Sequence, residues 1–485
     1  MKIVMATAEC VPFAKTGGLA DVAGALPKEL AALDHEVTVI LPKYSLIPEK
    51  YSEEFSLLKK IPVPITGSEE SYAVYEMALD NVRYLFIEND NYFARDEIYG
   101  QKDDAERFAF FNYAVLSVLE AGICEADILH VHDWHAAMIP FLLTEHNRYK
   151  KMSEKIKTIL TIHNLQFQGV FSKARFTENY KMDEQHADED AIEWNGDFNM
   201  LKTGILYADK VTTVSPSYRD EILTEQYGEG LHSVLQKREM DLSGILNGLD
   251  TAVYNPATDL AIEMEFDHTS VEGKAVNKRA IQTKFGLPER GDVPLAVMIS
   301  RLSGQKGIDI LEDALPEILD ASELQFVLLG SGEEKYEDFF RRLETDYPGQ
   351  VVAKIGFDEE LAHLLYAGAD IFLMPSHFEP CGLSQLISMR YGTIPVANKT
   401  GGLKDTVAEY AETLRSGNGF LSDFSKGESF SDALKRALSL YQQSESWENI
   451  KQNGMTGDYS WSRSAKEYRE LYEALLKEEV PRKNV

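Results

Sequence analysis

The glycine-rich turn at residues 15–22 (KTGGLADV) constrains the fold of this chain more than any other stretch. Before it, residues 2–7 (KIVMAT) form a short apolar run that predicts a buried parallel strand, and after it residues 20–33 carry apolar side chains at helical spacing. The turn is therefore expected at the carboxyl end of a strand. There Gly17 and Gly18 would let the backbone approach a ligand, and the free amides of the next helix would favour an anion.

The same turn chemistry returns near the other end of the chain. Residues 400–406 (TGGLKDT) repeat the pattern T-G-G-L-x-D after a second apolar run at residues 394–397. Two copies in two halves indicate two similar α/β units, each with a turn lined by backbone. A purely structural interpretation stays open for the first copy, in which its glycines only make a tight connection and Lys15 is a solvated surface residue.

Composition narrows the classes of protein that fit. A chain of 485 residues predicts two domains, or three. Because it has no run of 18 or more apolar residues and no signal-peptide pattern at its start, we expect a cytoplasmic soluble protein. The formal charge of −30 argues against binding to nucleic acid or to an anionic membrane. Cys10, Cys124 and Cys381 are few and far apart, which argues against a disulfide framework or a structural zinc site.

Strand-like and helix-like stretches alternate in both halves. In the first half the expected strands are residues 2–7, 36–41, 83–87, 128–132, 158–163 and 210–215, with a less regular region between the second and the third. The second half repeats the pattern more regularly from residue 294 to residue 397. Such alternation predicts doubly wound parallel sheets, in which ligands collect at the carboxyl ends of the strands.

A boundary between the two halves is expected near residues 244–256, where an Asn-Gly turn and a proline break the pattern. We therefore predict an N-terminal domain at residues 1–245 and a C-terminal domain at residues 246–459. Residues 460–485 are predicted to contain an amphipathic helix.

Two cations follow the strand expected at residues 295–299. Arg301 and Lys306 flank Gly304 at a strand-to-helix turn. A guanidinium that binds two oxygens at once and an ammonium that acts as a point charge suit a diphosphate. Ordinary surface charge is the alternative interpretation.

The densest group of polar residues is PSHFEPCGLS at residues 375–384. Glu379 lies just before a helix expected to begin near Gly382, so its carboxylate would accept hydrogen bonds from sugar hydroxyls beside free amides. The alternative is that Glu379 only complements the helix dipole. Cys381 is interpreted as a small buried thiol rather than a reactive one.

Weaker candidates follow other strands. Gly330 and Gly332 would approach a ribose or a phosphate, and Phe357 would stack on a base. His163 and Asp133 are polar residues at strand ends of the first half, and all five also fit ordinary structural roles. The sequence has no P-loop, no serine-nucleophile elbow, no His-Glu-x-x-His motif and no carboxylate cluster of the metal-binding type.

Together these stretches resemble the bacterial glycogen synthases and plant starch synthases, which are retaining glycosyltransferases of the GT-B fold. The resemblance rests on KTGGLADV at residues 15–22, HDWHA at 132–136, IHNLQFQG at 162–169, NGLD at 247–250, SRLSGQKG at 300–307, SHFEPCGLSQ at 376–385 and TGGLKDTV at 400–407. It covers nearly the whole chain. It implies an α/β fold of two Rossmann-like domains facing across a cleft, with the C-terminal helix crossing back to the N-terminal domain.

The resemblance also implies the reaction. Glucose would pass from ADP-glucose to the non-reducing end of an α-1,4-glucan such as glycogen, with retention of configuration and release of ADP. No cofactor and no metal would be required. Nothing in the sequence indicates the oligomeric state.

Site residues are implied by the resemblance position by position. The implied catalytic residues are Lys15, His163, Arg301, Lys306 and Glu379. The implied donor-binding residues are Gly17, Gly18, Asp21, Asp133, Asn247, Gly330, Gly332, Phe357, Cys381, Gly382, Leu383, Thr400, Gly401 and Gly402. The implied acceptor-binding residues are Tyr92 and Tyr99.

One position departs from the wider retaining GT-B pattern, in which a second glutamate follows the first by eight positions. That position here is Ile387, which bears on a contact to the ribose rather than on the activity.

Because no strong nucleophile stands out, we expect attack on the face that the leaving group departs from. The alternatives are a GT-B transferase using UDP-glucose or another acceptor, a phosphorylase carrying pyridoxal phosphate, and a non-catalytic protein that binds glucan or nucleotide.

Overall fold

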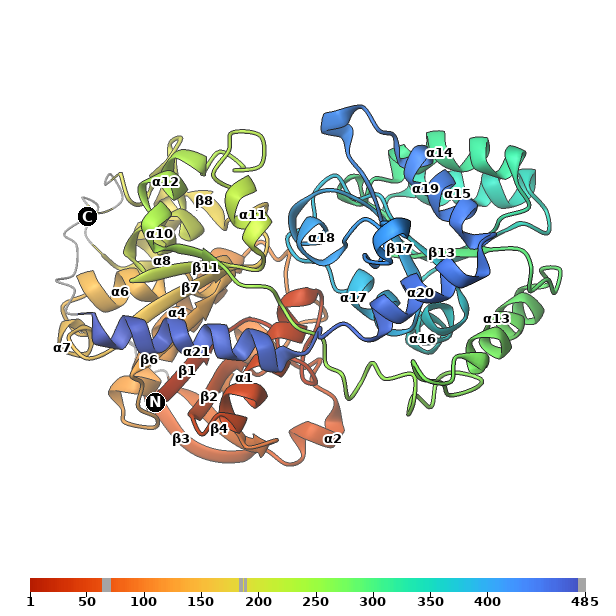
Figure 1. The fold of residues 1–485 in the computed structure, drawn as a ribbon. Coiled ribbons are helices and arrows are strands. Elements are labelled where there is room, and N and C mark those ends of the chain that lie inside the picture. Colours follow the sequence, from red (N-terminus) through yellow and green to blue (C-terminus); the bar gives the residue numbers. More distant parts are fainter. Residues whose placement is uncertain (63–70, 183–185, 187–189, 479–485) are drawn as a thin grey trace. The chain divides into compact units, whose positions relative to one another are not determined.

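The computed structural model describes residues 1–62, 71–182, 186 and 190–478 (Figure 1). The chain divides into two compact units. The first contains Met1–Gly248 and the helix that begins at Trp461, and the second is Leu249–Ser460. Each unit is a doubly wound α/β domain, as predicted. Within the described ranges, no helix combines the length and the apolar character needed to cross a membrane.

The first unit is built on a nine-stranded sheet in the order β12-β11-β7-β6-β1-β2-β5-β4-β3. Its strands are β1 (Lys2–Ala6), β2 (Glu36–Pro42), β3 (Ser56–Pro62), β4 (Ser71–Leu79), β5 (Val82–Glu88), β6 (Ile128–His132), β7 (Lys157–Ile162), β11 (Lys210–Thr213) and β12 (Leu242–Gly244). Neighbouring strands are parallel except that β4 is antiparallel to β3 and to β5. A smaller antiparallel sheet contains β8 (Val170–Ser172), β10 (Asp197–Asn199) and β9 (Glu193–Trp194).

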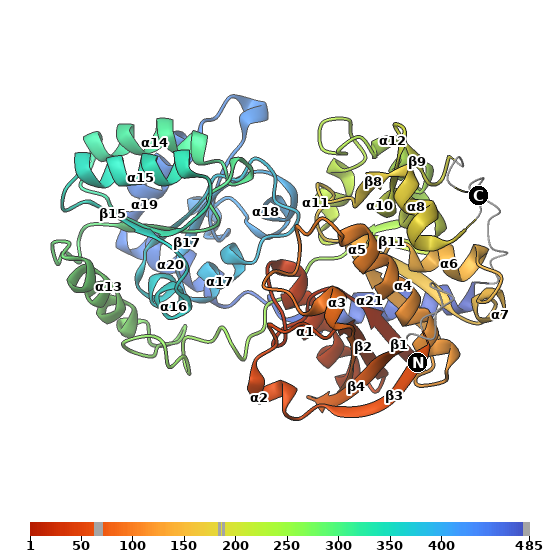
Figure 2. The same ribbon diagram turned by 180° about the vertical axis from the view of Figure 1, so that it is seen from behind.

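Helices cover both faces of the large sheet. They are α1 (Gly18–Ala32), α2 (Glu49–Ser52), α3 (Asp90–Phe93), α4 (Asp104–Glu120), α5 (Asp133–Ala136), α6 (Ile139–Glu145), α7 (Lys150–Ser153), α8 (Lys173–Tyr180), α10 (Met200–Tyr207), α11 (Pro216–Glu221), α12 (His232–Lys237) and α21 (Trp461–Lys477). Figure 1 views the face that carries α1 and α21, and Figure 2 views the face that carries α4 and α5.

Helix α21 completes the first unit because it carries a continuous apolar stripe. Trp461, Ala465, Tyr468, Tyr472 and Leu475 recur at three- and four-residue spacing, and all five are buried. This stripe packs the helix against the first unit, where it contacts α1. The C-terminal helix therefore returns to the N-terminal domain, as predicted.

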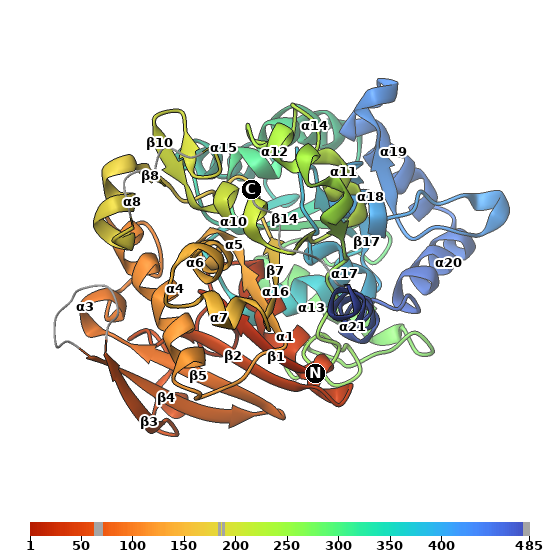
Figure 3. The ribbon, with the colours of Figure 1, turned by 90° about the vertical axis from the view of Figure 1, so that its left-hand side faces the viewer.

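The stretch between β2 and β5, predicted to be less regular, contains two further strands at one edge of the sheet (Figure 3). The edge strand β3 has a single buried residue, Ile61, and its other side chains are exposed. Without alternation between apolar and polar residues, the sequence gives no signal of period two there. The short strands β8, β9 and β10 were missed for a similar reason, since two or three residues are too few to show a period.

The second unit is built on a six-stranded parallel sheet in the order β15-β14-β13-β16-β17-β18. Its strands are β13 (Leu295–Ile299), β14 (Gln325–Gly330), β15 (Val351–Ile355), β16 (Ile371–Met374), β17 (Ile394–Asn398) and β18 (Phe420–Ser422). Alternate residues of β13 enter different cores: Ala296 and Met298 face one, and Leu295 and Val297 face the other. A strand buried on both faces explains why these runs are continuously apolar.

The helices of the second unit form a layer on each face of its sheet (Figure 2). They are α13 (Glu272–Phe285), α14 (Ile308–Ala321), α15 (Glu334–Asp346), α16 (Glu359–Gly368), α17 (Ser384–Arg390), α18 (Gly401–Thr406), α19 (Phe430–Tyr441) and α20 (Ser444–Met455). Helices α14, α15 and α19 contribute to one core, and α13, α16 and α17 contribute to the other.

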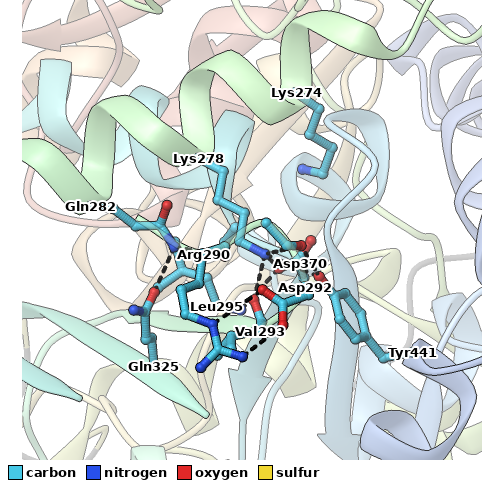
Figure 4. A network of polar contacts seen from close by, with 12 residues as sticks. Lys274, Lys278, Gln282, Arg290, Asp292, Val293, Leu295, Gln325, Asp370 and Tyr441 are labelled. Carbon is cyan, nitrogen blue, oxygen red and sulfur yellow. Dashed lines mark hydrogen bonds and ion pairs between the residues drawn. The ribbon is translucent and has the colours of Figure 1, made fainter. Parts of the chain in front are cut away.

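Helix α13 is fastened by buried ammonium groups (Figure 4). Lys278 Nζ lies 2.7 Å from Asp370 Oδ2 and donates to the Val293 carbonyl at 2.5 Å. Lys274 Nζ donates to Thr393 Oγ1 at 2.7 Å and to two backbone carbonyls. Because these buried nitrogens keep hydrogen-bond partners, they tie α13 to the rest of the second unit.

Gly368 allows α13 to pack closely on α16. A Cβ at this position would lie 2.5 Å from Ile281 Cδ1 and 2.7 Å from the backbone of Asn277. We expect Gly368→Ala to lower the melting temperature, because overpacking costs about 1–3 kcal/mol and each kcal/mol is worth about 2–4 °C in a domain of this size. The control is Gly291→Ala, where a Cβ meets no atom within 4 Å. Equal melting temperatures for the two variants by calorimetry would contradict the packing argument.

Candidate active site

The KTGG turn of the first unit is organised by a buried carboxylate. Glu9 is 3% exposed and accepts hydrogen bonds from the Thr16 backbone N–H, from the Gly17 N–H at 3.1 Å and from the Thr16 hydroxyl at 2.8 Å. The Tyr99 hydroxyl donates to the same carboxylate at 2.6 Å. These four donors fix the turn just before α1 begins.

Gly17 and Gly18 border open space. A Cβ added to either residue meets no atom within 4 Å among the described residues, and neither φ is positive. Packing within the unit therefore does not require glycine at these two positions. A ligand that approaches the backbone closely would require it, because a Cβ would stand in its way. Lys15 lies beside the turn, with Nζ 2.7 Å from Asp21 Oδ1 and both side chains partly exposed.

The tyrosines predicted to contact an acceptor already have partners in the first unit. Tyr99 stacks on His135, with 4.5 Å between ring centroids, besides donating its hydroxyl to Glu9. The Tyr92 hydroxyl donates to Glu106 Oε1 at 2.6 Å. Both side chains therefore help to hold the N-terminal unit together.

Two neighbouring strand ends bring Asp133 and His163 together. Asp133 follows β6, His163 follows β7, and Asp133 Oδ1 accepts the backbone N–H of His163 at 2.7 Å. Burial is the main cause that raises the pKa of Asp133 to about 7; the nearby charge of Glu9 also raises this pKa, and hydrogen bonds from the backbone of His163 and Asn164 lower it. Burial lowers the pKa of His163 well below its usual value, so this ring is neutral.

Asn247, the last predicted site residue of the first unit, is 9% exposed. Its Oδ1 is buried and has no hydrogen-bond partner within the described part of the chain. A buried amide oxygen in this state is an acceptor position that a donor group of a ligand would satisfy.

In the second unit, Lys306 and Glu379 form an ion pair. Lys306 Nζ lies 2.7 Å from Glu379 Oε2, and the Ser376 hydroxyl donates to the same oxygen at 3.0 Å. Glu379 is 6% exposed. Both donors use Oε2, and no described residue donates to Oε1, so that oxygen is the acceptor a ligand would meet.

Glycines hold the loops around this pair by close backbone packing. A Cβ on Gly330, Gly332 or Gly402 would collide with the backbone of a neighbouring loop. The Gly402 N–H donates to the Glu379 carbonyl at 3.0 Å and packs on the backbone of Cys381. The stretches at residues 375–384 and 400–406, which were predicted separately, are thus packed against each other. The second T-G-G-L copy therefore differs from the first, whose glycines border open space.

The remaining donor-binding candidates of the second unit stand at helix starts. Gly382 has a φ of 74° and Gly401 a φ of 42°, conformations that favour glycine. Leu383 directly precedes α17, and Thr400 directly precedes α18. Cys381 is buried, as interpreted from the sequence.

Two candidates of the second unit are open to solvent. Phe357 is 86% exposed and follows β15. Arg301 is exposed, and its guanidinium makes no hydrogen bond or ion pair with any residue that the structure describes. An unpaired guanidinium and an exposed aromatic ring are groups that a ligand would engage without displacing protein contacts.

These candidates all lie at the carboxyl ends of the strands of the second sheet. Arg301 and Lys306 follow β13, Gly330 ends β14, Phe357 follows β15, Glu379 follows β16 and Thr400 follows β17. Since the strand order is β15-β14-β13-β16-β17, all of them lie at adjacent carboxyl ends.

Three residues near the site, Glu9, Ser376 and His132, were not among the predicted site residues. Glu9 and His132 each stand at or just after a strand end, which is the signal that identified Asp133. Ser376 lies three residues before Glu379, within a motif already singled out. Each forms a hydrogen bond with another residue of the protein, and the sequence alone does not show which residues are paired in this way.

Where the structure describes the chain, no three His, Cys, Asp or Glu side chains gather as metal ligands would.

Known protein families match both halves of the chain. Residues 2–237 match the starch synthase catalytic domain, and residues 280–455 match the glycosyl transferases of group 1.

Similar proteins extend over nearly the whole chain. Glycogen synthase from Bacillus subtilis (strain 168) is 47% identical over 477 residues, which are 98% of this chain and 99% of the Bacillus protein. Glycogen synthase from Geobacillus thermodenitrificans (strain NG80-2) is 45% identical over 479 residues, which are 99% of each chain. Among solved structures, the catalytic domain of starch synthase IV from Arabidopsis thaliana, bound to ADP and acarbose, superposes with a TM-score of 0.90. It is 33% identical, and the match covers 98% of this chain and 99% of that one.

The raised pKa of Asp133 predicts how stability depends on pH. The folded pKa of about 7 exceeds the value of about 4 for an unfolded aspartate, so the stability contributed by this group falls as pH rises from about 4 to about 7. Asp133→Asn keeps an acceptor for the His163 N–H but cannot ionise. We therefore expect its melting temperature to rise relative to wild type across that range and to level off above it.

The control for this series is Asp96→Asn, which changes an exposed acid of the same unit. Its melting temperature relative to wild type is measured over the same pH range, as the comparison for removing an exposed carboxylate. A difference for Asp133→Asn that is independent of pH would contradict the assignment of the pKa.

Proposed function

This chain belongs to the glycogen and starch synthase family of GT-B glycosyltransferases, and we propose that its donor is ADP-glucose and its acceptor the non-reducing end of an α-1,4-glucan. Glucose would be transferred with retention of configuration, and ADP would be released. The relatives named above support this choice, since they are glycogen synthases and a starch synthase with ADP bound.

The observation that carries the proposal is the set of groups at the carboxyl ends of the strands of the second sheet. Arg301 is unpaired among the described residues, Lys306 is paired only with Glu379, and Phe357 exposes its ring. In the proposal the two cations bind the diphosphate, and the ring of Phe357 covers the adenine. Glu379 Oε1 then accepts a hydrogen bond from a hydroxyl of the donor glucose.

Charge development explains how these groups would accelerate the reaction. Breaking the bond between C1 and the phosphate oxygen leaves an oxocarbenium-like centre and adds negative charge to the diphosphate. Cations fixed beforehand stabilise that charge more strongly than reorganising water does. The carboxylate of Glu379 is held by Lys306 and Ser376, so it serves to orient sugar rather than to attack it.

We propose attack on the same face from which the diphosphate departs. In this step the acceptor hydroxyl forms its bond to C1, and its proton passes to the departing phosphate oxygen. Such a step needs no protein nucleophile, no metal ion and no other cofactor. Trapping a covalent glycosyl-enzyme would replace it with a double displacement.

The residues of the first unit are assigned supporting roles within the same proposal. Lys15 would stabilise the departing diphosphate, and His163, Asp133 and Asn247 would bind the donor glucose. Gly17, Gly18 and Asp21 would shape the turn, and Tyr92 and Tyr99 are assigned to the acceptor side. A cytoplasmic location also belongs to this proposal.

Donor choice is tested by glucose incorporation into a glycogen primer. We expect ADP-glucose to be used with a kcat/KM at least about tenfold above that of UDP-glucose, a difference of about 1.4 kcal/mol in transition-state binding. Removing divalent metals with EDTA should leave the rate unchanged. A preference for UDP-glucose would favour the alternative donor, and a loss of activity with EDTA would contradict the metal-free step.

Arg301→Ala tests the electrostatic part of the mechanism. Removing one preorganised group that stabilises transition-state charge costs about 10²–10³ in kcat, and we expect a loss of this size. The control is Arg342→Ala, which removes an exposed arginine from α15 in the same unit. Because Arg301 has no described partner in the protein, both variants should melt at the wild-type temperature, and equal kcat values for the two variants would contradict the assignment.

A further inference from the structure

A histidine that the proposed reaction does not use lies directly behind His163. His132 ends β6 and is completely buried, and its Nδ1 lies 3.0 Å from His163 Nε2. The other ring nitrogen of His132, Nε2, is buried and has no hydrogen-bond partner among the described residues. His163 Nδ1 has no hydrogen-bond partner in that part of the chain either, but it is not among the fully buried atoms.

Both rings are neutral, so each carries a single N–H. Burial lowers the pKa of His132 to about 3 and that of His163 well below its usual value. A hydrogen bond between two neutral imidazoles needs one N–H and one lone pair. Only two arrangements of the protons are then possible, and each fixes whether Nδ1 of His163, the nitrogen not bonded to His132, is a donor or an acceptor.

The unpartnered Nε2 of His132 indicates which of these two arrangements of the protons is present. If His163 donated to His132, the proton of His132 would sit on Nε2, where it would be a buried N–H without an acceptor. If His132 donates through Nδ1, its Nε2 carries only an unused lone pair. Orphaned buried N–H groups are rarer in proteins than acceptors that lack a partner, so the second arrangement is favoured.

The ring of His132 is also held firmly. It lies 4.2 Å from the ring of His130, measured between centroids. His130 is fixed in turn by Tyr472 of α21, at 2.8 Å from Nδ1, and by Thr161 of β7, at 2.5 Å from Nε2. The ring of His132 therefore packs against a neighbour that is itself held by two hydrogen bonds.

We propose that His132 is a positioning residue that holds His163 as the Nδ1–H tautomer, so that His163 offers a hydrogen-bond donor, and not an acceptor, to an oxygen of the substrate. This inference deepens the proposed function, because it assigns a chemical role to a residue of that site. It predicts that the group recognised by His163 is an oxygen lone pair, such as that of a sugar hydroxyl.

The tautomer is measured directly by ¹⁵N NMR of the full-length protein labelled at its 11 histidines. The signals of His163 are identified by their loss in His163→Gln. We expect Nδ1 of His163 to resonate as a protonated, pyrrole-type nitrogen and Nε2 as an unprotonated, pyridine-type nitrogen. A protonated Nε2, or signals averaged between the two tautomers, would overturn the proposal.

Two variants of His132 test its role in the reaction. His132→Asn keeps an N–H donor near the position of Nδ1, whereas His132→Leu removes it. For His132→Leu we expect the His163 signals to move toward the Nε2–H tautomer and kcat to fall roughly tenfold, the value of one hydrogen bond. His132→Asn should retain the wild-type spectrum of His163 and most of the activity.

Packing damage alone would give a different result. It would lower the melting temperature and the activity of both variants while leaving the tautomer of His163 unchanged, and that outcome would overturn the positioning role. The NMR measurement does not depend on turnover. A protein with the expected tautomer but no transfer from ADP-glucose would therefore contradict the proposed function alone, and an active protein with the opposite tautomer would contradict this inference alone.

Discussion

Close packing of backbone against backbone at the strand ends is the constraint on which the candidate site of the second unit depends. Gly330, Gly332 and Gly402 each lie where a Cβ would collide with a neighbouring loop. At Gly402 this contact is accompanied by a hydrogen bond to the Glu379 carbonyl. The loops after β14, β16 and β17 are therefore held by main-chain atoms, and they surround the ion pair of Lys306 and Glu379.

Charge is distributed unevenly between the two units. In the second unit the site contains true ions, Lys306 with Glu379 and the exposed Arg301. In the first unit burial keeps His132 and His163 neutral and brings the pKa of Asp133 to about 7. Within a chain whose formal charge is −30, the candidate site residues thus include a few cations, Lys15 among them, while the buried histidines of the first unit are neutral.

The fold was predictable where the spacing of apolar residues in the sequence shows a helical or strand period, and the position of a candidate residue was predictable where that residue follows a strand. The apolar runs of β1 and β13 and the stripe of α21 were found because burial on one or both faces leaves a pattern. The exposed edge strand β3 leaves no such pattern. Lys306 and Glu379 were found by their places after strands, but their ion pair was not, because 73 residues separate them. Glu9 and His132 act on other protein groups, and only coordinates reveal such pairs.

The return of α21 to the first unit has a consequence for the order in which the protein forms. The second unit is an insertion within the first, since the chain leaves after Gly248 and re-enters the first unit at Trp461. A ribosome therefore completes every strand of the first sheet long before it makes the helix that packs on α1 and supplies Tyr472 to His130. Until then the first unit lacks part of its core, while the inserted unit is synthesised as one continuous segment. The unit whose synthesis begins first is thus the unit that is completed last.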